Sequence, residues 1–349
     1  MEIKLATDFE KNKIIYEDLN NIFNSRNYWE NFNNKSILIT GAYGSIARFL
    51  SYFFLHLIKN YKFKIKLYLN GRNKNKMNEY FGRYSSYFNP VFNDLSKNMT
   101  GMPEKIDIVI HAASNARPDL FATRPVETII PNVIGLNSLL EKYKTARFLF
   151  FSTGSVYGKI KSDNITEDSQ GVINHYDVMS SYAESKRMGE LLCKSYAEEY
   201  GVDIRIVRIH HTYGPTLDLI DDNRTFSYFV KCAIKNENIV LNSDGTAKRA
   251  FLYISDAILA FCDILILGNK TEVYNMSAYS FTSIVDLARI VVKINGRICV
   301  EIKPKEIYVD SNSNRVVVSS VEKLKKLGWR QTINIENGFS RTINSFKYN

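Results

Sequence analysis

Residues 36–47 read Ser36-Ile-Leu-Ile-Thr40-Gly41-Ala-Tyr-Gly44-Ser-Ile-Ala47. The run 36–40 is short and apolar, as is typical of a strand buried on both faces of a parallel sheet. Two glycines follow it, and apolar residues then recur at helical spacing from residue 45 to about residue 58. A strand, a tight turn and a helix in this order predict the first unit of a doubly wound α/β sheet.

The same alternation continues along the chain to residue 209. Further strands are predicted at 64–69, 106–110, 147–151 and 204–209, and a long helix is predicted at 182–200. Strands that alternate with helices favour right-handed crossovers and a parallel sheet. Near the N-terminus one amphipathic helix is expected, because Ile14, Ile15, Leu19, Ile22 and Phe23 recur at helical spacing.

The predicted fold class is therefore α/β: a Rossmann-type doubly wound parallel sheet, a smaller C-terminal mixed substrate domain and an N-terminal helical extension. The extension is expected to cover residues 1–34 and the dinucleotide-binding domain residues 35–210. Residues 251–280, the segment 251–267 in particular, are expected to return to the sheet. The substrate domain then comprises 211–250 and 281–349.

Composition excludes several classes of protein. The 349 residues are 45% hydrophobic and 23% charged, which is unlike a disordered chain, a collagen or a coiled coil. The longest apolar stretch is too short to span a bilayer, and no secretory signal is visible. The four cysteines are scattered without a Cys-x-x-Cys pair, so we expect reduced thiols and a cytoplasmic location.

The net charge of +10 is concentrated at residues 59–76, which hold seven basic residues and no acidic one. No nucleic-acid motif accompanies this run, so a nucleic-acid partner is not expected. An anionic small ligand such as a nucleotide fits it better. A solvated, lysine-rich surface is the alternative interpretation.

The glycine turn has the spacing Gly-x-x-Gly-x-x-Ala between a strand and its helix. A dinucleotide site needs a tight turn, close approach of the backbone to a pyrophosphate, and a helix N-terminus aimed at the anion. A small third residue, Ala47, lets the helix pack on the strand. The residues expected to contact the cofactor here are Gly41, Tyr43, Gly44, Ser45 and Ile46, although a purely structural turn is an alternative.

The end of the second strand indicates which dinucleotide is bound. An NAD site usually has an acidic residue there, to hold the ribose hydroxyls. This chain has Asn70 instead, and Arg72 follows at a position suited to a 2′-phosphate, with Lys74 or Lys76 in support. NADP is therefore the expected cofactor, with NAD as the alternative, and Arg72 could instead belong to the basic surface run.

A Tyr-x-x-x-Lys pattern occurs twice, at Tyr157 with Lys161 and at Tyr182 with Lys186. The second pair begins a predicted helix, where the spacing places both side chains on one face. A nearby ammonium would stabilise a phenolate and lower the pKa of the tyrosine. We therefore expect Tyr182 to act as the acid/base and Lys186 to tune it.

Several motifs in a fixed order resemble the extended short-chain dehydrogenase/reductases of the sugar-nucleotide epimerase/dehydratase group. The resemblance covers residues 40–329 and leaves the N-terminal extension out. It is carried by Thr40-Gly-Ala-Tyr-Gly, Asn93-Asp94-Leu95, His111-Ala-Ala-Ser114, Asn132-Val-Ile-Gly135, Ser152-Thr-Gly-Ser-Val-Tyr-Gly158, Tyr182-x-x-x-Lys186, Tyr213-Gly-Pro215, Asp244-Gly-Thr-Ala-Lys-Arg249 and Leu327-Gly-Trp329.

The resemblance implies further site residues. Thr153 should hydrogen-bond the sugar at the reacting carbon, beside Tyr182, and Arg249 and Arg315 should clamp the substrate diphosphate. Surface ion pairs are the alternative for both arginines. Additional cofactor contacts are implied for Asp94, Leu95, Ala112, Ala113, Ser114, Asn132 and Lys186, and additional substrate contacts for Ser155 and His211. His211 could instead make a structural hydrogen bond, and Asn132 could serve helix packing alone.

The resemblance implies hydride transfer at a sugar carbon, C4 being the expected position, on a nucleotide-activated sugar. An NADPH-dependent 4-keto reductase, or the reverse dehydrogenase, of polysaccharide or deoxysugar biosynthesis leads the candidates. A 4-epimerase is the alternative, and a non-catalytic dinucleotide sensor a third. Relatives in this group often dimerise through helices that match residues 132–143 and 182–200, so a homodimer is expected, and no metal is required.

One departure from the group bears on the reaction. Its dehydratases carry Asp-Glu directly after the catalytic threonine, and its decarboxylases carry Ser-Glu, but this chain has Gly154-Ser155. Elimination needs a base and an acid. Neither residue supplies one at neutral pH, and Glu184 should point away from the face that Tyr182 and Lys186 share. Dehydratase and decarboxylase activities are therefore not expected.

Overall fold

The fold is built on a seven-stranded parallel sheet, seen in the computed structural model, which describes residues 7–97, 99–160, 162, 164–303 and 318–347. Every neighbouring pair of strands runs parallel, and the predicted fold class is confirmed. In the spatial order β12-β7-β5-β4-β1-β2-β3, the strands are β12 (Glu272–Met276), β7 (Asp203–Ile209), β5 (Arg147–Thr153), β4 (Ile108–His111), β1 (Ser36–Thr40), β2 (Lys66–Gly71) and β3 (Asn89–Phe92).

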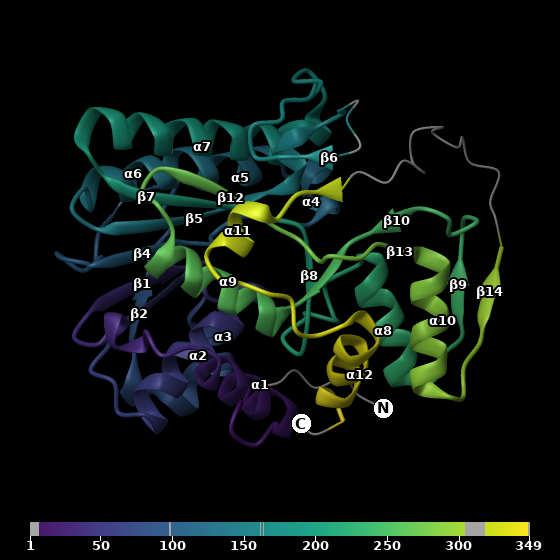
Figure 1. The fold of residues 1–349 in the computed structure, drawn as a ribbon. Helices are drawn as coiled ribbons and strands as arrows, with labels where there is room; N and C mark the ends of the chain where they lie inside the picture. The colour runs from purple at the N-terminus through teal and green to yellow at the C-terminus, as the bar shows by residue number, and fades with distance from the viewer. Residues whose placement is uncertain (1–6, 98, 161, 163, 304–317, 348–349) are drawn as a thin grey trace.

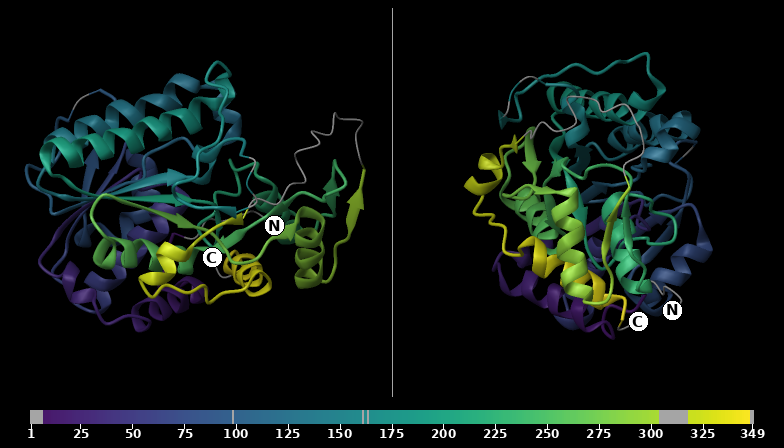
Figure 2. Two further views of the ribbon diagram at one scale, coloured as in Figure 1. Left: turned by 45° about the horizontal axis from the view of Figure 1, so that its top comes forward. Right: turned by 90° about the vertical axis from the view of Figure 1, so that its right-hand side faces the viewer.

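Helices cover both faces of the sheet, as Figures 1 and 2 show. Side chains along each strand alternate between two cores: Ile37 and Ile39 join one, whereas Leu38 joins the other. One face carries α1 (Lys13–Asn24), α2 (Ser45–Asn60), α3 (Lys74–Phe81) and α9 (Ile254–Leu267). The other carries α5 (Pro125–Ile130), α6 (Leu136–Lys142) and α7 (Ser181–Tyr200).

A second group of elements lies beyond the carboxyl ends of the strands (Figure 1). Its helices are α8 (Thr225–Lys235), α10 (Ile284–Asn295) and α12 (Ile335–Ser345). Its strands form small two-stranded sheets: β8 (His211–Tyr213) with β11 (Phe251–Tyr253), β9 (Ile239–Leu241) with β14 (Val300–Ile302), and β10 (Lys248–Arg249) with β13 (Thr282–Ser283). The side of the molecule that holds this group is therefore where a ligand would meet both parts.

The predicted return of residues 251–267 to the sheet takes place through a helix that packs on the sheet, and not through a strand that joins it. The strand β11 pairs with β8 and not with the seven-stranded sheet, because β8 continues the chain beyond the end of β7. The helix α9 then packs on β5 and β7, and β12 pairs with β7 at the sheet edge. The segment therefore rejoins the sheet through a covering helix and a later strand.

The remaining elements are short connectors. They are the 3₁₀ helices at Trp29–Phe32, Gly82–Tyr87, Gly154–Tyr157 and Val178–Ser180, the helices α4 (Pro118–Thr123) and α11 (Glu322–Lys326), a π-helical turn at Pro131–Gly135, and the strand pair β6 (Asn164–Ile165) with β15 (Val318–Ser319). The π turn directly precedes α6, and such turns often occur at functional sites.

The N-terminal helix α1 is held against α9 and α12 by buried charges. Asp18 accepts hydrogen bonds from the Tyr253 hydroxyl at 2.5 Å and from the Arg341 Nε at 2.9 Å. Burial raises the pKa of the Asp18 carboxyl to about 6, although Arg341 opposes the shift. The extension is therefore fixed to the body by specific polar contacts as well as by apolar packing.

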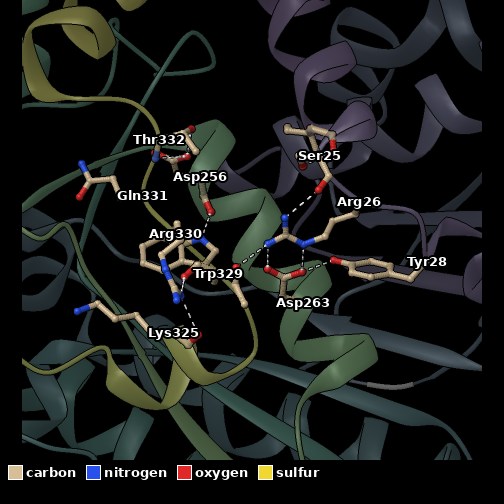
Figure 3. A network of polar contacts seen from close by, with 12 residues as sticks. Ser25, Arg26, Tyr28, Asp256, Asp263, Lys325, Trp329, Arg330, Gln331 and Thr332 are labelled. Carbon is tan, nitrogen blue, oxygen red and sulfur yellow. Dashed lines mark hydrogen bonds and ion pairs between the residues drawn. The ribbon is translucent and has the colours of Figure 1, made fainter.

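A second anchor lies where the chain leaves α1, and Figure 3 shows it. Arg26 donates two hydrogen bonds to the fully buried Asp263 of α9, from Nε to Oδ1 at 2.9 Å and from Nη2 to Oδ2 at 2.7 Å. The Tyr28 hydroxyl donates to the same carboxylate at 2.5 Å. Nearby, the indole of the buried Trp329 donates to the Asp256 carbonyl at 2.9 Å.

We predict that Arg26→Ala lowers the free energy of unfolding by about 3 kcal/mol, because it leaves the Asp263 carboxylate buried without its cation. Urea denaturation measures the change. Lys13→Ala is the matched control, since Lys13 is exposed and 4.0 Å from Glu17, and it should cost less than about 1 kcal/mol. Equal losses in the two variants would contradict the prediction.

Candidate active site

The glycine turn lies where the strand order reverses, between β1 and β4, which is where doubly wound sheets bind ligands. Gly41 has a φ of +65°, and a Cβ added there would lie 2.6 Å from the Ala113 Cα. Only glycine therefore allows the turn to approach the end of β4 this closely. Helix α2 begins at Ser45, so its free N–H groups face the same place.

The hydroxyl of Thr40 ties the ends of these two strands together. It accepts hydrogen bonds from the backbone N–H groups of Ala112 at 3.2 Å and Ala113 at 3.3 Å. It also lies 2.9 Å from the Nδ1 of His111, whose Nε2 lies 3.2 Å from the Pro131 carbonyl. Burial lowers the pKa of His111 to about 3, so the imidazole is neutral. Its Nε2–H then donates to Pro131 and its Nδ1 accepts from Thr40.

An outer cavity of about 380 Å³ opens beside this turn. The structure brings together there most of the predicted cofactor residues: Gly41, Tyr43, Gly44, Asn70, Arg72, Asp94, Leu95, Ala112, Ala113 and Ser114. Lys76 lines it too, whereas Lys74 does not. Gly71 lines the cavity as well, and a Cβ there would lie 2.1 Å from the Tyr43 ring, so the ring can pack on the backbone only because residue 71 is a glycine.

The side chains of Asn70 and Arg72, at the end of β2, differ in their burial and in the contacts that hold them. The Asn70 amide is buried and donates to the carbonyls of Val91 at 3.2 Å and Asn93 at 3.3 Å. Arg72 is 62% exposed, and its Nη1 lies 3.8 Å from the Asp94 carboxylate. An exposed pair at that distance contributes little stability, so the guanidinium can turn to another anion.

An inner cavity of about 660 Å³ continues from the glycine turn, past the ends of β5 and β7. Its wall holds these predicted residues: Gly44, Ser45, Ile46, Ala112, Ser114, Thr153, Ser155, Tyr182, Lys186, His211 and Arg249. Among the described residues that line it there is no carboxylate. Positive charge from Lys186, Arg224 and Arg249 therefore faces the cavity without a lining acid to balance it.

The pair Tyr182 and Lys186 lies at the start of α7. The Tyr182 ring stacks on Phe121, with centroids 4.7 Å apart and planes 5° apart. Burial raises the pKa of the Tyr182 phenol, while the Thr153 hydroxyl and the charge of Arg224 lower it. Lys186 is buried, donates to the Phe151 carbonyl at 2.6 Å, and has a pKa lowered to about 7 by burial. Glu184 is not in the cavity wall and pairs with Arg187 at 3.6 Å.

Thr153 and Ser155 support each other at the end of β5. The Ser155 N–H donates to the Thr153 Oγ1 at 3.2 Å, and the Thr153 hydroxyl lies 3.3 Å from the Ser155 Oγ. Thr153 thereby caps the short helix Gly154–Tyr157. Its hydroxyl is held at the cavity wall, on the same side as Tyr182.

The tyrosine of the other Tyr-x-x-x-Lys pattern, Tyr157, lies in a separate buried network. Its hydroxyl donates to the Asn275 Oδ1 at 2.6 Å and accepts from the Arg208 Nη1 at 2.9 Å. Arg208 also forms a bidentate pair with Glu190, which accepts a hydrogen bond from Ser152. Tyr157 does not line the inner cavity, and Lys161 lies outside the described residues.

Other predicted residues lie as follows. Asn132, in the π-helical turn, lines neither of the two cavities, and its amide donates to the Thr128 carbonyl and the Ser185 hydroxyl, both at 3.0 Å. This arrangement fits the alternative of helix packing. Arg315 lies outside the described residues. His211 and Arg249 also border a third cavity of about 950 Å³ that runs along α8.

Sequence reasoning missed several residues of the inner cavity, among them Arg224, Phe121 and His210. Arg224 precedes α8 and pairs with Asp222 through contacts of 2.9 and 2.7 Å, and it lines both the inner and the third cavity. Arg224 had a weak signal as an arginine just before an amphipathic helix, whereas the positions of Phe121 and His210 depend on contacts between distant segments.

No three or more His, Cys, Asp or Glu side chains in the described ranges come together as a metal site would need. Within the same ranges, no helix is both long enough and apolar enough to cross a membrane.

The parallel sheet and the glycine turn at the point where its strand order reverses are of the Rossmann type. The family profile described as "NAD dependent epimerase/dehydratase family" matches residues 37–277. UDP-glucuronic acid decarboxylase 6 of Arabidopsis thaliana is 32% identical over 317 residues, 90% of this chain and 89% of the relative. The chain therefore belongs to the NAD dependent epimerase/dehydratase family, as the motifs predicted.

A further relative is similar in sequence, and solved structures are similar in fold. UDP-glucuronic acid decarboxylase 1 of Xenopus tropicalis is 31% identical over 70% of this chain and 57% of the relative. UDP-glucose 4-epimerase from Thermotoga maritima, solved with UDP-glucose, has a TM-score of 0.73 at 22% identity, covering 89% of this chain and 98% of that one. UDP-glucuronic acid 4-epimerase from Bacillus cereus, solved with NAD, has a TM-score of 0.73 at 23% identity, covering 89% and 96%. At these identities the two structures show the fold alone.

Proposed function

We propose that the protein is an NADP(H)-dependent oxidoreductase that reduces the 4-keto group of a nucleotide-activated sugar, or catalyses the reverse oxidation. The observation that carries this proposal is that Thr153, Tyr182 and Lys186 line one cavity with the glycine turn, while no carboxylate among the described lining residues is present. The named relatives act on UDP-glucuronic acid, which supports a nucleotide sugar as the substrate class.

The residues present fit a dinucleotide, because the cradle at Gly41 is a space that any Cβ would fill. A bound nicotinamide would supply or accept the hydride. Tyr182 would give its proton to the substrate carbonyl oxygen, and Thr153 would hydrogen-bond the same oxygen and orient it. Negative charge that develops on the Tyr182 oxygen favours the ammonium form of Lys186, which in turn stabilises that charge.

The arginines suit the rest of the substrate. Arg249 and Arg224 lie where the inner cavity meets the third cavity, and planar guanidinium groups bind phosphate oxygens in pairs. We place the diphosphate between them, with the sugar toward Tyr182 and the nucleoside along α8. Arg315 remains a predicted second clamp.

A homodimer is also part of the proposal. Helices α5 and α7 pack against each other and expose large apolar side chains, among them Val126, Ile129, Met188 and Leu191. Apolar side chains that cluster on neighbouring exposed helices indicate a partner surface.

The first prediction concerns the acid/base. Tyr182→Phe should lower turnover by at least about 100-fold, because general acid–base catalysis typically contributes 10²–10⁴-fold, and it should leave cofactor binding nearly intact. Tyr157→Phe is the matched control: it should keep turnover but lose roughly 1–3 kcal/mol of stability, since Arg208 and Asn275 lose a buried partner. Steady-state kinetics and urea denaturation of both variants test this. If Tyr157→Phe abolished turnover and Tyr182→Phe did not, the assignment would be wrong.

The second prediction concerns the cofactor. Arg72 is exposed and pairs with Asp94 only at 3.8 Å, which supports its assignment to a 2′-phosphate, so we expect the wild type to bind NADP(H) more tightly than NAD(H). Arg72→Ala should weaken NADP(H) binding by roughly 1.5–3 kcal/mol, the range for hydrogen bonds to charged groups, and leave NAD(H) binding nearly unchanged. Titration calorimetry with both cofactors measures this. Arg83→Ala, which removes an exposed arginine outside the two cofactor cavities, is the control.

A wild type that prefers NAD(H), or an Arg72→Ala variant with unchanged NADP(H) affinity, would contradict the cofactor assignment.

The third prediction tests the reaction itself. With a 4-keto nucleotide sugar and NADPH, the product should gain two hydrogens while NADPH is consumed. With UDP-glucose, UDP-glucuronic acid or dTDP-glucose, no product should be lighter by water or carbon dioxide, because Gly154 and Ser155 provide neither acid nor base. Mass spectrometry of the products decides. Interconversion of 4-epimers without net cofactor consumption would indicate the epimerase instead, and a loss of water or carbon dioxide would contradict the proposal.

A further inference from the structure

Gly154 has no room for a side chain, because the imidazole of His210 occupies the space beside it. A Cβ built on Gly154 would lie 2.3 Å from the His210 Cε1, 2.6 Å from Nδ1 and 2.8 Å from Nε2. Gly154 directly follows β5, and His210 directly follows β7, the neighbouring strand of the sheet. The imidazole of His210 therefore fills the space that a side chain at position 154 would otherwise occupy.

The His210 ring is fixed in place but not fully bonded. Its backbone N–H donates to the Met276 carbonyl at 3.1 Å, which ties the residue to the neighbouring strand β12. Its Nε2 is buried and has no hydrogen-bond partner in the described part of the chain. Leaving a buried polar nitrogen unpaired costs stability. Because His210 is one of the residues that line the inner cavity, a ligand bound there is the candidate partner for the ring.

The position of the ring places it next to the reacting groups. His210 lines the inner cavity together with Thr153 and Tyr182. The ring packs on Gly154, and Gly154 directly follows Thr153 in the chain. A sugar whose reacting carbon lies between Thr153 and Tyr182 would bring a neighbouring ring position to His210.

We propose that His210 is a specificity-determining residue that hydrogen-bonds a hydroxyl group of the sugar, next to the carbon addressed by Thr153 and Tyr182. This proposal rests on the proposed function. A hydroxyl is the matching group because a neutral imidazole offers one donor and one acceptor, as a hydroxyl does. Burial and the charge of Arg208 lower the pKa of His210 to about 4, which keeps the ring neutral at pH 7.

The experiment compares the affinities for a nucleotide and for its sugar ester. In a Tyr182→Phe background, which limits turnover, titration calorimetry measures the Kd of UDP and UDP-glucose, and of dTDP and dTDP-glucose, with oxidised cofactor present. His210→Phe keeps a ring against Gly154 but removes both nitrogens. It should weaken binding of the nucleotide sugar by about 3- to 10-fold, the loss of one neutral hydrogen bond, and leave the free nucleotide unchanged. His210→Gln, which retains a donor and an acceptor, should recover part of the loss.

Unchanged binding of the nucleotide sugars by His210→Phe would overturn the proposal while leaving the proposed function intact. If the parent variant bound none of the nucleotides or nucleotide sugars, the proposed function itself would fail, and this inference with it. If the His210→Phe variant does not fold, the wild-type protein, which keeps the imidazole, provides the test. In wild-type protein labelled with ¹⁵N-histidine, the His210 nitrogen resonances should then shift on adding UDP-glucose and not on adding UDP, and equal shifts with both would overturn the proposal.

The packing of the ring has its own test. Gly154→Ala should lower the melting temperature in the wild type, because its Cβ would overlap the imidazole. In a His210→Ala background the same substitution should have little effect. Equal shifts in both backgrounds would show that the ring does not fill this space, and would overturn the proposal.

Discussion

The hydroxyl of Thr40 joins the two strands on which the site depends. The parallel sheet reverses its strand order between β1 and β4, and the crevice beyond their carboxyl ends is the place where the chain can meet a ligand. Thr40 holds that crevice by accepting two backbone hydrogen bonds from Ala112 and Ala113 and by pairing with His111. The close approach of Gly41 to Ala113 then sets the width of the turn. The glycine turn, the outer cavity and the inner cavity all follow from this junction.

A second junction sets the position of the groups that we propose to be catalytic. Glu190 lies one turn beyond Lys186 on α7, and its carboxylate accepts hydrogen bonds from Ser152 of β5 and Arg208 of β7. Ser152 precedes Thr153, so the carboxylate fixes the end of β5 relative to the helix that carries Tyr182 and Lys186. A buried pair of this kind gains little net stability, because desolvation offsets the attraction. Its value here is geometric: it keeps the Thr153 hydroxyl on the same cavity wall as the Tyr182 phenol.

The sequence predicts the parts that local pattern determines. Apolar runs of strand length and the helical spacing after the glycine turn follow from the periods of strand and helix, so β1, β5, β7, α2 and α7 begin or end close to their predicted positions. Local pattern does not determine which segment packs on which. The pairing of β11 with β8, the stacking of Phe121 on Tyr182, and the ring of His210 beside Gly154 each join residues far apart in the chain. Motif reasoning thus finds Tyr182 and Lys186, whereas His210 and Arg224 emerge only once the strands are assembled.

The electrostatics of the inner cavity distinguish Lys186 from the two histidines that line it. Burial and the charge of Arg208 lower the pKa of His210 to about 4, and desolvation with the charges of Arg249 and Arg224 lowers that of His211 to about 3, so neither ring is cationic at pH 7. Lys186, with a pKa near 7, is then the lining group whose charge changes most readily around neutral pH. It lies on the same helical face as Tyr182, one turn away. Proton transfer at the Tyr182 oxygen is what the proposed carbonyl reduction requires, and no carboxylate among the described lining residues offers the acid or base of an elimination.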